Sequence, residues 1–315
     1  MAFLKALYTK LTASAFAWPL KIAVTAAVVF LVNKTVSKAY VPELARHCSL
    51  LLITASFLAG CAGYFLQVLR WKIILRWSSI SIRFPDALRT MLWGSLLAFI
   101  TPGRTGEFFR GLSLPSAKKD ATLWCVAADK VFAGGAVLVF GVLGCIVVHA
   151  KKEPYAWGHW AIVIAAGLAL IATCIALPLK GGRALKALKS RFVAVSKLSL
   201  YSVILLSAVA HALLLTQTAL LFSMFGVNGA MNAALAGSLA YALMLLFPFF
   251  IANMGIREYS FGMFLGQVTL SRGLTAPAVA LGASMGILAI NILAPAIAGL
   301  VWWLIPKMAR CDRMQ

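Results

Sequence analysis

The chain has 315 residues, of which 62% are hydrophobic and 12% charged, and its mean hydropathy is +0.93. Soluble domains carry about 25% charged residues, so this composition excludes a soluble enzyme and predicts an integral membrane protein. The net charge is +21. Because Lys and Arg gather in cytoplasmic loops and meet anionic lipid headgroups, we expect membrane lipids as partners and no nucleic acid.

Six apolar segments are long enough to cross a bilayer, which takes about 20 residues in a helix. They cover residues 14–33, 49–69, 121–149, 159–179, 199–225 and 277–305. We interpret the first as a retained helix because no small-residue cleavage site precedes a polar region. The basic and aromatic segment 70–87 is expected along the cytoplasmic interface, with Trp71 and Trp77 at headgroup depth.

Two further apolar regions, 88–115 and 232–272, are interrupted by turn residues. The first breaks at Pro102-Gly103 and the second at Asn253-Met254-Gly255. Each resumes with charged and aromatic residues, and charges at membrane depth are costly and usually functional. We therefore predict an all-α polytopic membrane protein with about six transmembrane helices and two opposed re-entrant helical hairpins.

The basic residues also predict the topology. They concentrate in residues 70–89, in residues 180–197 and at the C-terminus, and placing these inside puts both termini in the cytoplasm. The chain then forms one membrane domain, 1–315, with a first repeat at 1–150 and an inverted second repeat at 151–315. Inverted repeats with paired broken helices are typical of transporters, whose site lies near the midplane.

The motifs around the first break resemble a known family. Gly94, the stretch FITPGRTGE from Phe99 to Glu107, Arg110 and then Asp129-Lys130 are similar to the lysylphosphatidylglycerol synthase transmembrane region, a flippase-like membrane domain family. The resemblance covers nearly the whole chain. It implies a bacterial or archaeal protein that moves modified lipids, with aminoacylated phosphatidylglycerol, hopanoid lipids and polyprenyl-phosphate-linked sugars as suggested cargoes.

Two features depart from that family's pattern. The second hairpin reads ANMGIRE from Ala252 to Glu258, where the family often has Pro-Gly-rich residues. The soluble aminoacyl-transfer domain of the bifunctional synthases does not follow the membrane part here, so we do not expect synthase activity.

The charged residues of the hairpins are the candidate site. A helix that begins after Pro102-Gly103 would point its positive end into the membrane, where it could bind phosphate. Arg104 and Arg257 would contact an anionic headgroup, with Glu107 and Glu258 as counter-charges, gates or contacts to sugar hydroxyls or amines. Alternatively, the charges form salt bridges that hold the two hairpins together. The predicted substrate-binding set is Arg104, Glu107, Arg110, Asp129, Lys130, Asn253, Arg257 and Glu258.

Two further residues, Asp129 and His211, leave alternatives open. Asp129 could pair with Arg104 or Arg110, take up a proton, or lie at the cytoplasmic edge. His211, the histidine in the middle of a predicted span, fits a hydrogen-bonded structural role, a proton relay or a substrate contact. Glycines of the third span form a small-residue packing face, at Gly134, Gly135, Gly141 and Gly144.

These observations favour a bacterial inner-membrane translocase for a lipid or a polyprenyl-phosphate-linked sugar. We expect no catalytic residue, cofactor or metal, because the sequence shows no nucleotide loop, nucleophile elbow or His/Cys cluster. The alternatives are an integral-membrane transferase acting on a polyprenyl-phosphate lipid, a non-catalytic subunit of a lipid-modifying system, and an ion-coupled carrier for a small anion. The sequence also permits a homodimer or association with a lipid-modifying enzyme.

Overall fold

The structure, a computed structural model, describes residues 46–101, 105–114, 119–150, 195–246, 253, 255–265 and 273–304. The elements that these residues form are all helices, and none of the described residues forms a strand. Four helical stretches are long and apolar enough to cross a membrane: Leu50–Trp77, Ala121–Val147, Lys197–Met224 and Ala276–Trp302. They correspond to four of the six predicted spans. The predicted spans 14–33 and 159–179 lie outside the described residues.

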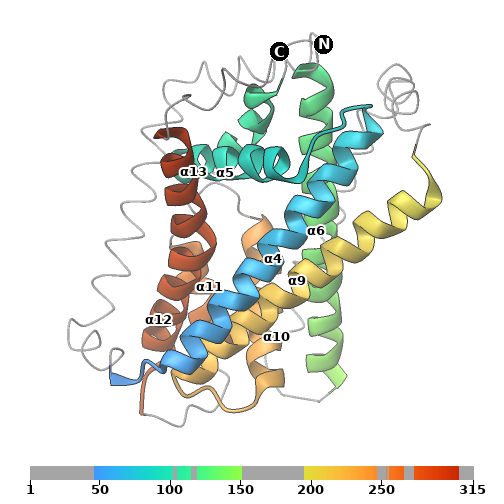
Figure 1. Cartoon of the computed structure of the whole chain (residues 1–315). Coiled ribbons are helices and arrows are strands. Elements are labelled where there is room, and N and C mark those ends of the chain that lie inside the picture. Colours follow the sequence, from blue (N-terminus) through green and yellow to red (C-terminus); the bar gives the residue numbers. More distant parts are fainter. Residues whose placement is uncertain are drawn as a thin grey trace, which may run out of the picture.

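Two long helices pack against each other. Helices α4 (Leu50–Trp77) and α9 (Lys197–Met224) have 28 residues each and lie side by side in blue and yellow (Figure 1). They are antiparallel, because the end of α4 contacts the start of α9 through a 2.5 Å hydrogen bond from Trp77 Nε1 to Ser199 Oγ. Close approach is possible at Gly63, where an added Cβ would lie 3.7 Å from a carbonyl oxygen of α9.

The end of α4 corrects one prediction. Residues 70–77 continue the span instead of lying along the interface, and the Trp71 and Trp77 side chains are buried, at 0% and 6% exposure. Trp71 Nε1 donates to Thr90 Oγ1 at 2.9 Å. The sequence suggested an interfacial segment because it is basic and aromatic. In the fold, both indoles pack with Ile74 and Leu75 into the core cluster of the first half.

Each interrupted region consists of a 17-residue helix followed by a shorter one. In the first, α5 (Phe84–Ile100) precedes the 3₁₀ helix η1 (Thr105–Ser113), and in the second, α10 (Ala230–Leu246) precedes α11 (Ile256–Leu265). The residues between the paired helices, 102–104 and most of 247–254, lie outside the described part. Helix α5 crosses the upper end of the molecule and α10 extends to the lower end (Figure 1). Entry of the two regions from opposite membrane faces stays a prediction.

The last span of each half packs against the interrupted region of the other half. Helix α6 (Lys119–Ala150) contacts α10 at Gly141 and Gly144, where an added Cβ would lie 2.6 Å from Ala242 Cβ and 2.5 Å from Ser238 Oγ. The final span consists of α12 (Ala276–Leu288), the π-helical turn η3 (Ala289–Leu293) and α13 (Ala294–Leu304). Its Gly299 lies against the backbone of α5. Reciprocal packing of this kind is what two related halves would produce, and the inverted repeat remains our proposal.

The glycine contacts give a test within one helix. Gly141→Ala should destabilise the protein by about 1–3 kcal/mol, because overpacking forces rigid helices apart. Gly135→Ala is the matched control, since no atom lies within 4 Å of its added Cβ. Thermal unfolding in detergent measures both variants, and equal melting temperatures would contradict the packing described for α6 and α10.

Candidate functional site

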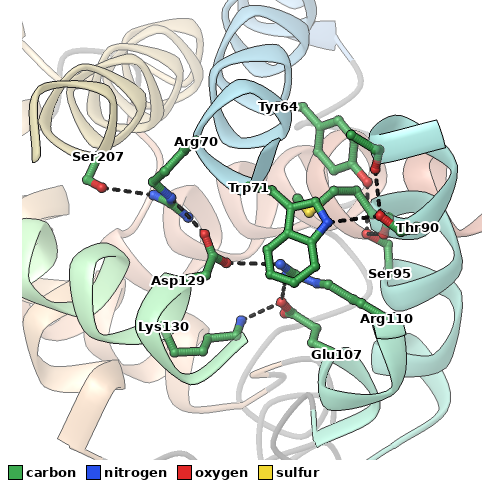
Figure 2. A network of polar contacts seen from close by, with 12 residues as sticks. Tyr64, Arg70, Trp71, Thr90, Ser95, Glu107, Arg110, Asp129, Lys130 and Ser207 are labelled. Atoms are coloured by element: carbon green, nitrogen blue, oxygen red, sulfur yellow. Dashed lines mark hydrogen bonds and ion pairs between the residues drawn. The ribbon is translucent and has the colours of Figure 1, made fainter. Parts of the chain in front are cut away.

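Five charged side chains meet where α4, η1 and α6 come together (Figure 2). Four of them are buried, at 4% exposure or less, and Lys130 is partly exposed. Such charges are expensive inside a membrane unless they are paired. The cluster consists of Arg70 from α4, Glu107 and Arg110 from η1, and Asp129 and Lys130 from α6. We refer to these five residues as the charged cluster.

Asp129 lies at the centre of the charged cluster. Its Oδ1 accepts a hydrogen bond from Arg70 Nε at 2.8 Å, and its Oδ2 accepts one from Arg110 Nη1 at 2.9 Å. Arg70 also donates from Nη1 to Ser207 Oγ on α9 at 3.2 Å. Of the two arginines considered as partners of Asp129, Arg110 pairs with it, and Arg104 lies outside the described residues. One carboxylate therefore fastens α4, η1 and α6 to one another.

Glu107 forms the second half of the charged cluster. Its carboxylate pairs with both Arg110 and Lys130. Residues three apart eclipse each other in a 3₁₀ helix, which places Glu107 and Arg110 on one face of η1. The Lys130 side chain is 38% exposed, in contrast to the buried arginines. If all five groups are ionised, three cations face two carboxylates, and the cluster carries one excess positive charge.

Small residues make room for the charged cluster. An added Cβ at Gly94 would collide with the Arg110 side chain, and one at Gly106 would collide with the backbone of α5 at Leu97. These contacts explain why both glycines belong to the motif around the first break. Thr101 holds the two sides of that break together, since its hydroxyl donates to the Leu97 carbonyl at 2.8 Å and accepts from the Gly106 N–H at 2.6 Å.

An aromatic ring covers the other side of Arg110. The guanidinium carbon lies 5.7 Å from the centre of the Trp71 ring, which is within the range of a cation–π interaction. Figure 2 shows the indole beside the arginine while its N–H points toward Thr90. Arg110 is thus fixed by two carboxylates and a ring, and its position is set before any ligand arrives.

The second interrupted region holds a smaller polar group. Arg257 Nε donates to Ser284 Oγ on α12 at 2.6 Å, and Arg257 Nη2 lies 3.3 Å from Glu258 Oε1. Glu258 also accepts from Ser284 Oγ and, at 2.5 Å, from the Gly255 N–H. In this last bond, the side chain of the third helical residue accepts from the N–H of the residue before the helix, as in a capping box. Glu258 therefore stabilises the start of α11. Asn253 precedes it with a positive φ of 58°, which asparagine tolerates.

The two groups are held separately within the described residues. The ion pairs of the first join α4 and η1 to α6, and the pair in the second lies within α11. We considered above that salt bridges between these charges join the two hairpins. The described ion pairs do not join them, because each pair lies within one of the two groups. Arg104, the predicted headgroup contact in the first break, lies outside the described residues.

Sequence reasoning missed three polar partners. Arg70 was counted among the orienting basic residues, and nothing singled out Ser207 or Ser284. A partner such as Arg70 could have been expected from the sequence, because a buried Asp129 in an apolar span needs more than one hydrogen-bond donor. The two serines gave no signal, since serine is common in membrane helices at packing positions.

His211 packs as an aromatic ring. It is buried, and its ring centre lies 5.2 Å from that of Phe140 on α6 and 6.0 Å from that of Tyr241 on α10, both edge to face. Its Nε2 has no hydrogen-bond partner in the described part of the chain. The ring contacts favour the structural role of His211 over the proton relay.

The charged cluster predicts that removing the charge of Asp129 strongly lowers the stability of the protein. Asp129→Asn leaves Arg70 and Arg110 without their shared carboxylate, and breaking a buried ion pair from one side costs about 3–5 kcal/mol. We expect a clear fall in melting temperature, partly recovered in the double variant Arg70→Gln/Asp129→Asn. Asp86→Asn, at an exposed position in the first turn of α5, should lower the melting temperature far less, because a surface charge at a helix N-terminus contributes only about 0.3–1 kcal/mol. An unchanged melting temperature for Asp129→Asn would show that the cluster does not hold the helices together.

Comparison with known proteins shows the family to which the chain belongs. A family model described as "Lysylphosphatidylglycerol synthase TM region" matches residues 18–299. No curated protein and no solved structure matches the chain significantly. Because the family match covers far more than half of the 315 residues and four described helical stretches can cross a membrane, this chain is a multi-pass membrane protein of the lysylphosphatidylglycerol synthase TM region family.

Proposed function

We propose that this protein moves an anionic lipid or a polyprenyl-phosphate-linked sugar across the bacterial cytoplasmic membrane. The observation that carries the proposal is the charged cluster, in which three cations face two carboxylates inside a membrane protein. Its excess positive charge matches a ligand with one negative charge. Membership of a family named for a lipid synthase supports a lipid as that ligand.

Lys130 is the residue of the charged cluster best placed to meet the headgroup first. Its side chain is 38% exposed, whereas the side chain of its partner Glu107 is 3% exposed. A phosphate that approaches Lys130 would compete with Glu107 for the ammonium group and would then face the guanidinium of Arg110. An Arg fork suits a phosphate because two N–H groups can donate in parallel. Arg104, next to the break, is a further proposed contact.

The second polar group would act on the other side of the membrane. Arg257 and Glu258 form one cation and one anion, so this group has no excess charge if both are ionised. We propose that Asn253, Arg257 and Glu258 contact the headgroup more weakly than the charged cluster does. A headgroup held strongly at one end and weakly at the other can be released after it has crossed.

The path of the lipid follows from the proposed inverted repeat. The headgroup would pass between the two interrupted regions while the acyl or prenyl tail stays in the bilayer. Both termini would lie in the cytoplasm. A gradient, trapping of the product or a partner protein would supply the driving force, since the sequence carries no nucleotide-binding loop.

Reconstitution into liposomes tests the proposal. Purified protein should move a fluorescent or enzymatically readable anionic lipid across the bilayer. Lys130→Gln, Arg104→Ala and Glu107→Gln should each lower the rate at least tenfold while the protein still folds, because each removes a headgroup contact or its counter-charge. Lys197→Gln is the matched control, since this lysine is exposed at the start of α9.

The outcomes separate the proposal from its rivals. Movement that is lost in the three variants and kept in Lys197→Gln supports a self-sufficient translocase with its site at the charged cluster. Wild-type rates in all three variants would refute the site. If phospholipid, aminoacyl-lipid and polyprenyl-phosphate cargoes all stay in place, a transferase or a partner-dependent subunit becomes the better explanation.

A further inference from the structure

The final span contacts both interrupted regions, each through a different half. Its first half, α12, is joined to the second region, because Ser284 bonds to both Arg257 and Glu258 of α11. Its second half, α13, packs on the first region, where an added Cβ at Gly299 would lie 2.5 Å from the Leu92 carbonyl oxygen of α5. The span therefore links the two regions that carry the proposed headgroup contacts.

The helical hydrogen bonds of this span are interrupted between its two halves. In the π-helical turn η3, the Ala294 N–H bonds to the Ala289 carbonyl, five residues back, instead of to that of Ile290. The next residue, Pro295, has no N–H to donate to the Asn291 carbonyl, and a proline ring in a regular helix clashes with that carbonyl. Sharp helix kinks occur at prolines and at π-helical turns, and this span has both at one point.

The turn itself is held against the two long helices. Asn291 Nδ2 donates to Gln217 Oε1 of α9 at 2.7 Å. On the other side, an added Cβ at Gly60 of α4 would lie 2.7 Å from Ile290 Cγ2. Helices α4 and α9 lie side by side (Figure 1), so the middle of the final span is anchored to this pair while its two ends are attached to different regions.

The two halves of the span also pack on different neighbours. Helix α12 lies against α9 as well as α11, since an added Cβ at Gly286 would lie 3.0 Å from the Leu221 side chain. Helix α13 packs on α5, where the added Cβ at Gly299 would also lie 3.4 Å from Leu96 Cβ. A straight, rigid span would have to move α5 and α11 together. A span that bends at its middle lets the two regions move separately.

We propose that the final span bends at η3, so that α13 moves with the first interrupted region while α12 stays with α9 and the second. Hinges between packed bodies are a few residues that absorb the change of direction, and η3 with Pro295 supplies them here. The role of the bend in transport rests on the proposed translocation, in which the charged cluster and the second polar group would open in turn. The bend itself does not depend on that function.

Distances between two nitroxide spin labels test the inference, with the labels carried by unnatural amino acids so that the native cysteines stay. One label replaces Leu205 on α9, and the other replaces either Val301 on α13 or Thr275 at the start of α12; all three positions are exposed. The full-length protein is placed in nanodiscs of phosphatidylcholine, without an anionic lipid. The distance distribution to Val301 should be at least twice as broad as that to Thr275, because α13 bends relative to α9.

Two proline substitutions in the same span locate the bend. Pro295→Ala supplies an N–H for the Asn291 carbonyl and removes the ring that disfavours a straight helix. It should therefore narrow the Val301 distribution to about the width of the Thr275 distribution. Pro277→Ala is the matched control, because this proline lies in the first turn of α12, where a helix tolerates it, and it should change neither distribution.

Equal widths for the two label pairs would overturn the inference and would mean that the span moves as one rigid helix. This comparison uses the otherwise wild-type chain, so it decides the matter even if Pro295→Ala does not fold. A folded Pro295→Ala variant with an unchanged Val301 distribution would overturn the assignment of the bend to η3. If the widths differ as expected while every cargo stays in place in liposomes, the proposed function fails and the bend stands.

Discussion

The first half of this protein depends on the burial of one carboxylate between two arginines. Asp129 receives hydrogen bonds from Arg70 and Arg110 at 2.8 and 2.9 Å. Each arginine comes from a different element, so the carboxylate joins a long span, a short 3₁₀ helix and a second span. A charge without its partner is costly at low dielectric. The position of η1 and the burial of the end of α4 both follow from this requirement.

The two halves share helix lengths but differ in charge. Helices α4 and α9 each have 28 residues, and Arg70 and Gln217 occupy the same position, twenty residues after the start of each. In the first half Arg70 pairs with Asp129, and in the second Gln217 pairs with Asn291. The corresponding helix positions therefore carry a charged pair in the first half and a pair of neutral amides in the second. In the proposed translocase, this difference would let the first half attract the headgroup more strongly than the second does.

The composition and short-range patterns of the sequence determined the class of the protein and several of its details. Long apolar segments identified four spans that the structure contains, because crossing a bilayer needs a fixed length of apolar helix. The turn residues marked the C-terminal end of α5 and the start of α11. The motifs around Glu107 and Arg110 indicated the family that the comparison shows.

Only the tertiary structure decided which distant residues meet. Arg70 and Asp129 are 59 residues apart, and Arg257 and Ser284 are 27 apart. Trp71 was predicted at headgroup depth, but the rotation of α4 turns its ring into the core beside Arg110. The length of an apolar run determines where a transmembrane helix begins and ends in the sequence. The rotation and depth at which helices pack depend on all their neighbours at once, and those contacts are not encoded in any local pattern of residues.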